Sequence, residues 1–266
     1  MERCNLKQTS GQRNDGIAIL KAIAAFMVVW IHLGVHGAGN PAVYAVTKYA
    51  DALCRMAVPV FFIITGYFFS GYMDRTWPKL KKLLTLTITA SVLYVILDLW
   101  TGDEYRNLIS ETKWIPHFLI YNIFPPFAGH LWYMYAVLYA IPVVVVIRRF
   151  AGLKALYAVA LVLYICGLCL NYTEYSYMVR SWLFMGIPNV VIGIILRESS
   201  FEAKPSKLMW MCIMGQALVL AEVYMRGRLG LVFAGRDVYV ASSFAAAASF
   251  LWMFNRNFGG VKCVNV

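Results

Sequence analysis

The chain has 266 residues, of which 61% are hydrophobic and only 14% are charged, and its mean hydropathy is +0.65. This apolar share is well above that of a typical soluble domain, so the composition excludes a water-soluble globular protein. The formal net charge of +11 would favour a nucleic-acid partner in a soluble protein, but most basic residues here lie in short segments between apolar stretches. The charge therefore indicates membrane topology, the bilayer is the expected partner, and no nucleic acid is expected.

Eight apolar stretches match the length that a helix needs to cross a bilayer, about 20 residues at 1.5 Å each. We expect an all-α fold, a polytopic bundle of about eight transmembrane helices that forms one domain over residues 1–266. Eight crossings place both termini on the same side. The expected spans are 17–37, 53–72, 83–100, 130–147, 155–170, 181–197, 208–225 and 237–254.

Lysine and arginine are distributed unequally between the two sets of loops. The first set carries fifteen basic residues and consists of the N-terminal tail, the loops at 73–82, 148–154 and 197–207, and the C-terminal tail. The alternate loops carry seven. The positive-inside rule then predicts a multi-pass protein of the cell membrane with a cytoplasmic N-terminus. The longest loop, 101–129, would lie outside and fold onto the membrane surface, because it is rich in aromatic residues.

Two ionisable residues lie inside the first expected span, where a charge at the helix centre costs roughly 2.5 to 3.5 kcal/mol. Lys21 and His32 are eleven residues apart, so their side chains share a helix face to within about 20° and lie about 16 Å apart along the axis. We expect both to point into one groove. The alternatives are that Lys21 reaches the cytoplasmic headgroups and that His32 bonds a neighbouring helix.

The second and fourth expected spans both enter the membrane from the outer side. Arg55 near the start of the second span, and His130 and Trp132 at the start of the fourth, should therefore lie at about the depth of His32. An arginine there can hold a carboxylate, a phosphate or a developing oxyanion. The alternatives are an Arg55 that reaches the outer headgroups or pairs with Asp51, four residues earlier, and a Trp132 that belongs to an aromatic belt.

A basic cluster follows the second expected span on the opposite side of the membrane. It consists of Lys79, Lys81 and Lys82. The positive-inside rule alone would explain these charges, and phosphate binding is the alternative. No metal-ligand set is expected.

Three segments, in this order and spacing, resemble the membrane-bound acyltransferase 3 family, which includes surface-polysaccharide O-acetyltransferases and the membrane domain of some serine racemases. Asp15–Gly34 contains Lys21 and His32 at the family's ten-residue gap. Arg55–Phe69 is similar to the family's arginine, proline, paired aromatics and Gly-aromatic step. Gly129–Pro142 is similar to the histidine-tryptophan entry of the fourth helix in one branch.

The resemblance implies transfer of an acyl group, commonly acetyl from acetyl-CoA, to a hydroxyl of a cell-surface glycan or related acceptor. Acyl-CoA is then a co-substrate and no bound cofactor is expected. His32 would act as base or acyl relay with Lys21 and Arg55 in support. His130 and Trp132 would contact the acceptor, and the basic cluster would bind acyl-CoA.

The chain departs from the family pattern in two ways. Members usually have about ten helices, so eight spans predict a short or truncated version of the fold. The polysaccharide branch often has an acidic residue shortly after the tryptophan, where this chain reads Tyr133–Val137. Two alternatives therefore stay open beside the enzyme: a noncatalytic remnant or membrane anchor subunit, and a small-molecule transporter, for which Pro188 in the sixth span offers a helix break.

Overall fold

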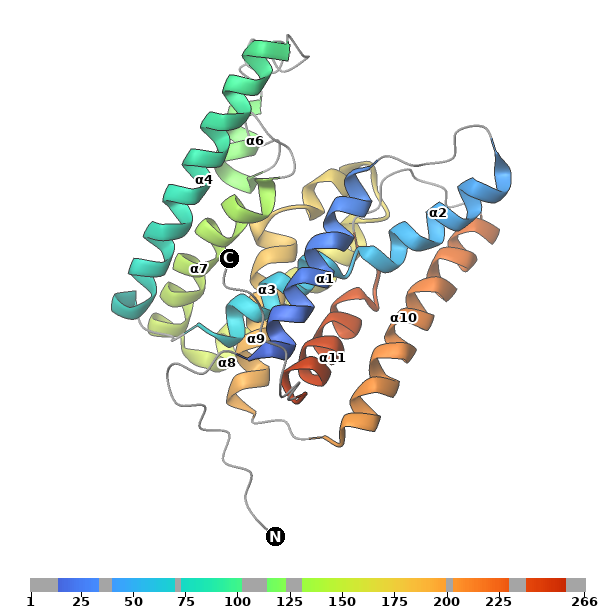
Figure 1. Cartoon of the computed structure of the whole chain (residues 1–266). Coiled ribbons are helices and arrows are strands. Elements are labelled where there is room, and N and C mark those ends of the chain that lie inside the picture. Colours follow the sequence, from blue (N-terminus) through green and yellow to red (C-terminus); the bar gives the residue numbers. More distant parts are fainter. Residues whose placement is uncertain are drawn as a thin grey trace.

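The computed structural model describes residues 14–33, 40–69, 73–101, 114–122, 131–199, 203–229 and 238–256, and these ranges contain helices and no strand. The helices form one bundle, with α4, α6 and α7 along one flank and α10 along the other (Figure 1). In chain order the helices are α1 Asp15–His32, α2 Pro41–Cys54, α3 Ala57–Tyr67, α4 Met73–Thr101, α6 Trp114–Tyr121, α7 Trp132–Phe150, α8 Gly152–Leu170, η2 Glu174–Val179, η3 Trp182–Gly186, α9 Ile187–Glu198, α10 Pro205–Arg228 and α11 Ser242–Phe254.

Six helical stretches in the described part of the chain are long and apolar enough to cross a membrane, which confirms the all-α class and makes this a multi-pass membrane protein. They are 15–32, 41–67, 76–97, 132–150, 152–170 and 205–228. The sixth expected span appears as η3 followed by α9, and the eighth as the shorter α11. The eighth span was expected from residue 237, but α11 begins at Ser242, so Tyr239 precedes the helix.

The predicted start of the second span, residue 53, lies too late in the sequence. The helix starts at Pro41, where the side-chain oxygen of Asn40 accepts hydrogen bonds from the backbone N–H of Ala42 (2.9 Å) and Val43 (3.4 Å). An asparagine cap followed by proline is a strong start signal. Proline at position 59 has no N–H to donate to the carbonyl of Arg55, so the helix bends there and continues as α3.

Two segments expected as loops are helical. The third span was expected to begin at residue 83, but α4 begins at Met73, so the three lysines of the basic cluster lie on its first turns. The expected loop 101–129 contains α6, whose Phe118 ring contacts that of Tyr135 on α7 with the ring centroids 5.2 Å apart. Charged residues in the first turns of a helix lower the local hydropathy, but they do not prevent the helix from forming.

The centre of the bundle is formed by α3 and α9, whose backbones touch. A methyl group added at Gly66 would collide with the carbonyl oxygen of Val190, and one added at Gly193 with that of Ile63. Small residues that allow such close approach are a common basis of helix packing in membranes. By contrast, α4 and α8 turn apolar side chains such as Leu86 and Leu161 outward, where lipid would cover them.

The first and last described helices meet at one end of the bundle. The side-chain nitrogen of Asn14, just before α1, donates a hydrogen bond to the carbonyl of Phe254 at the end of α11 (3.0 Å). The same end holds the start of α4 (Figure 1). His32, the last residue of α1, therefore lies toward the opposite end.

Candidate active site

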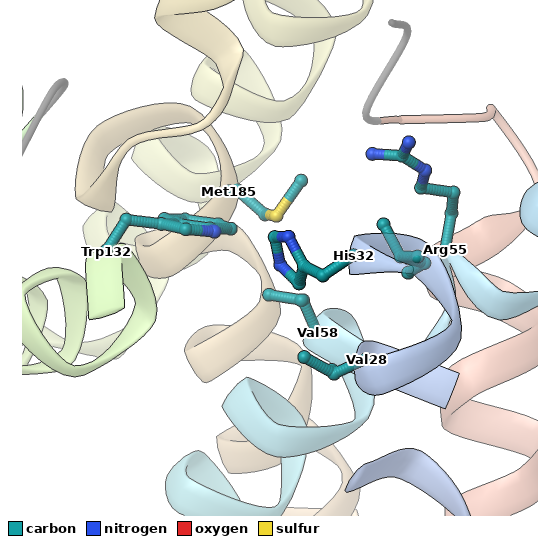
Figure 2. Close-up of a pocket in the computed structure, with 7 residues that line it drawn as sticks. Val28, His32, Arg55, Val58, Trp132 and Met185 are labelled. Atoms are coloured by element: carbon teal, nitrogen blue, oxygen red, sulfur yellow. The ribbon is translucent and has the colours of Figure 1, made fainter. Parts of the chain in front are cut away.

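A small pocket opens where the end of α1 meets the bend between α2 and α3, the start of α7, and η3. Its volume is about 40 Å³. Figure 2 shows the imidazole of His32 pointing from α1 toward Met185 and Trp132, with Val58 and Val28 beneath it and the Arg55 side chain above. The lining residues are Val28, Ile31, His32, Arg55, Val58, Trp132 and Met185.

Helix α1 brings His32 to the pocket. Its first turn is capped by the side-chain oxygen of Asn14, which accepts from the N–H of Ile17 (3.0 Å). At the other end, the N–H of Leu33 donates to the carbonyl of Val29 (3.1 Å), which closes the last turn around His32. Val28 lies four residues before His32 and so lines the pocket from the same helix face.

The bend between α2 and α3 positions Arg55. Its Nε donates to Oδ2 of Asp51 (3.1 Å), and its Nη2 lies 3.5 Å from Oδ1. Both side chains are largely buried, with 14% and 13% exposed. The sequence offered pairing with Asp51 and a place at the pocket as alternatives for Arg55, and the structure shows both. Pairing through Nε orients the guanidinium at the edge of the pocket.

Trp132 and Met185 form the wall opposite His32. Trp132 is the first residue of α7 and is 6% exposed. The centroids of its ring and of the Phe62 ring lie 6.2 Å apart. Met185 is 3% exposed and belongs to η3, a short π-helix. π-Helical turns are rare and frequently occur at functional sites.

Asn122, which sequence analysis missed, ties these two walls together. It is fully buried (0% exposed) and has a positive φ of 51°, a conformation that asparagine tolerates better than most residues. Its Nδ2 donates to the carbonyl of Trp132 (3.0 Å), and its Oδ1 accepts from the N–H of Trp182 (2.7 Å). One side chain therefore fixes the start of α7 relative to the start of η3.

The pocket joins an exposed imidazole, a largely buried cation and apolar walls. A base next to a cation in a partly dehydrated site can remove a proton and stabilise the negative charge that develops, as acyl transfer requires. Within the part of the chain that the structure describes, no group of three His, Cys, Asp or Glu side chains could hold a metal ion.

A family model described as an acyltransferase domain, acyltransferase 3, matches residues 14–260. The chain belongs to the acyltransferase 3 family. Among curated proteins, an amino-acid racemase of Enterococcus faecalis is 32% identical over 161 residues, which cover 59% of this chain and 22% of the relative. The chain thus matches about a fifth of that relative's length. No solved structure matches it.

The family match includes all three segments on which the resemblance rests. The structure brings together His32, Arg55 and Trp132 from these segments at one pocket. Their depth was expected from the order of the spans; their catalytic and binding roles stay predictions. His130 lies outside the described residues.

The structure does not bring Lys21 to the pocket. Its side chain is exposed on α1, eleven residues before His32 and therefore about 16 Å away along the axis. The expectation of one groove for both residues is thus not met among the lining residues. Lys79, Lys81 and Lys82 are exposed on α4, and the Lys81 ammonium lies 5.5 Å from the ring centre of Trp77.

Proposed function

We propose that this chain is a membrane-bound acyltransferase that moves an acyl group, in the first instance acetyl, from acyl-CoA to a hydroxyl of a cell-surface glycan or related acceptor. Membership of an acyltransferase family supports the reaction class. The observation that carries the proposal is the pocket in which the His32 imidazole lies between apolar walls and the Arg55 side chain. The donor and the acceptor come from the family resemblance.

In the proposed reaction, His32 accepts the proton of the acceptor hydroxyl as its oxygen attacks the thioester carbonyl carbon. A carbon–oxygen bond forms, the carbon–sulfur bond to CoA breaks, and the proton passes from the imidazole to the departing thiolate. The Arg55 guanidinium stabilises the oxyanion that develops on the carbonyl oxygen. The products are an ester and free CoA, so atoms and charge balance.

The test is acetyl transfer from labelled acetyl-CoA to surface glycan in membranes that contain the full chain. A positioned base contributes about 10²- to 10⁴-fold to rate, so His32→Ala should reduce transfer by at least about 100-fold per membrane-inserted molecule. If His32 only bonds a neighbouring helix, the cost is about 1 kcal/mol of stability, and activity per folded molecule should persist. His36, four residues further along the sequence, lies outside the described residues, and His36→Ala is the matched control, expected to stay active.

The donor side of the proposal is tested in the same assay over a range of acetyl-CoA concentrations. The exposed Lys79, Lys81 and Lys82 are proposed to bind the CoA phosphates, and point charges of this kind contribute mainly to binding. Replacing all three with Gln should raise KM for acetyl-CoA with little change in kcat. An unchanged KM would assign the cluster to topology alone. Absence of transfer by the unmutated chain would favour a noncatalytic role.

A further inference from the structure

The pocket beside His32 has walls of two kinds. Apart from His32 and Arg55, its lining is apolar and consists of Val28, Ile31, Val58, Trp132 and Met185. Of these five side chains only Trp132 carries an N–H that could bond a hydroxyl-rich acceptor, whereas a hydrocarbon group gains from leaving water against all five. The walls therefore suit the acyl part of a donor better than a sugar.

The pocket volume of about 40 Å³ exceeds the roughly 10–15 Å³ that one water-sized group needs, so an acetyl group can enter. A longer chain would have to pass Met185 or push its side chain aside.

Met185 lies where such a displacement would occur. In Figure 2 its side chain extends toward the imidazole of His32 from the wall opposite α1. The backbone behind it is held, since the carbonyl of Ser181 accepts hydrogen bonds from the N–H groups of both Met185 and Gly186 (3.1 Å each). Gly186, next in the chain, packs against Phe62 and Ala140.

The π-helical turn leads directly into α9. The N–H of Ile187, the first residue of α9, donates to the carbonyl of Trp182 five residues earlier, and Pro188 after it has no N–H to bond the carbonyl four residues earlier. Asn122 holds the first residue of the turn through its bond to the N–H of Trp182. Met185 is thus presented to the pocket by a turn that is fixed at its start and packed at its end.

We propose that this pocket is the acyl subsite of the enzyme and that Met185 sets the longest acyl chain that it accepts. The inference rests on the proposed function and adds a specificity residue to it. One methylene in a fitted apolar pocket changes specificity by about 10- to 200-fold. The unmutated chain should therefore prefer acetyl-CoA over butyryl-CoA by at least about tenfold in kcat/KM.

The experiment measures kcat/KM for acetyl-, propionyl- and butyryl-CoA with membranes that contain the full chain. Met185→Ala removes the thioether arm and should lower the acetyl-to-butyryl ratio by at least about tenfold. Met185→Leu conserves volume and should keep the ratio of the unmutated chain. Val58→Ala enlarges the same pocket from α3 and should shift the ratio in the same direction as Met185→Ala, which secures the test if that variant does not insert.

Met253→Ala is the matched control. Met253 is similarly buried (5% exposed), but it belongs to α11 and packs in the core next to α1, away from the pocket. It should lower the amount of inserted protein and leave the donor ratio unchanged. A donor ratio that stays the same in both Met185→Ala and Val58→Ala would overturn the acyl subsite while acetyl transfer itself stands. Absence of transfer from all three donors by the unmutated chain would instead remove the proposed function, and the subsite with it.

Discussion

At the scale of single residues, the pairing of Arg55 with Asp51 matters more than the presence of a cation. The guanidinium contacts the carboxylate through both Nε and Nη2. A lysine keeps the charge but has no planar fork, so it cannot be oriented in the same way. The position of the charge relative to the developing oxyanion is therefore set by Asp51.

We expect Arg55→Lys to fall close to Arg55→Gln, with kcat/KM lowered by about 100-fold in each, because a displaced charge stabilises the transition state poorly. Asp51→Asn keeps the charge of Arg55 but holds the guanidinium less firmly, so this variant should lower kcat/KM by about tenfold. Acetyl transfer at varied acetyl-CoA concentration, normalised to inserted protein, measures all three. An Arg55→Lys variant with nearly full activity would show that a cation suffices without orientation.

At this scale the sequence singled out His32, Arg55 and Trp132 but not the rest of the pocket wall. His32, Arg55 and Trp132 were expected at one depth because the first expected span ends, and the second and fourth begin, on the outer side of the membrane. Met185 and Asn122 had no such signal. A methionine in an apolar span is indistinguishable from its neighbours, and the bond from Asn122 to Trp182 joins residues 60 positions apart.

At the scale of elements, Asn122 connects α6 to the starts of α7 and η3. Asn122→Ala would leave a carbonyl and an N–H without their partner in a buried site, and each unsatisfied group costs about 1–3 kcal/mol. We expect a clear fall in the midpoint of thermal unfolding in detergent and a matching fall in acetyl transfer. Asn122→Asp, which keeps an acceptor for Trp182 but loses the donor, should lie between Ala and the unmutated chain.

The backbone and the side chain of Asn122 can be separated. Gly accepts the positive φ at no cost, so Asn122→Gly removes only the side-chain bonds. If those bonds hold the elements together, the Gly and Ala variants should unfold at similar temperatures. A Gly variant as stable as the unmutated chain would mean that only the backbone conformation matters.

Element boundaries were harder to predict than element types. The start of the span 17–37 agrees with that of α1 to within two residues, because the segment is mostly apolar; α1 ends at His32, and residues 34–37 lie outside the described residues. The helix from Pro41 was missed over its first turns, since Lys48 and Asp51 lower the local hydropathy. In the structure Lys48 approaches Gly227 of α10 and Asp51 holds Arg55, so both charges are accommodated by neighbours that hydropathy does not report.

At the scale of the whole molecule, the orientation in the membrane is the main prediction to test. The distribution of fifteen and seven basic residues predicts that the end where α1 starts and α11 finishes faces the cytoplasm. A reporter that is active only outside should be active when fused after Asn107 and silent when fused after Arg149. The reverse pattern would invert the orientation and place the pocket on the cytoplasmic side.

The walls of the pocket differ in stiffness. Two of its walls, α3 and the η3–α9 segment, touch backbone to backbone at Gly66 and Gly193, so their spacing is as stiff as a packed core. The third wall, α1, is buried only along its first half, at Ile17, Leu20 and Ala24, and its last turns carry outward-facing apolar side chains. Bilayer thickness and lateral pressure therefore act on the histidine more directly than on the wall opposite it, which makes lipid composition a variable of the site itself.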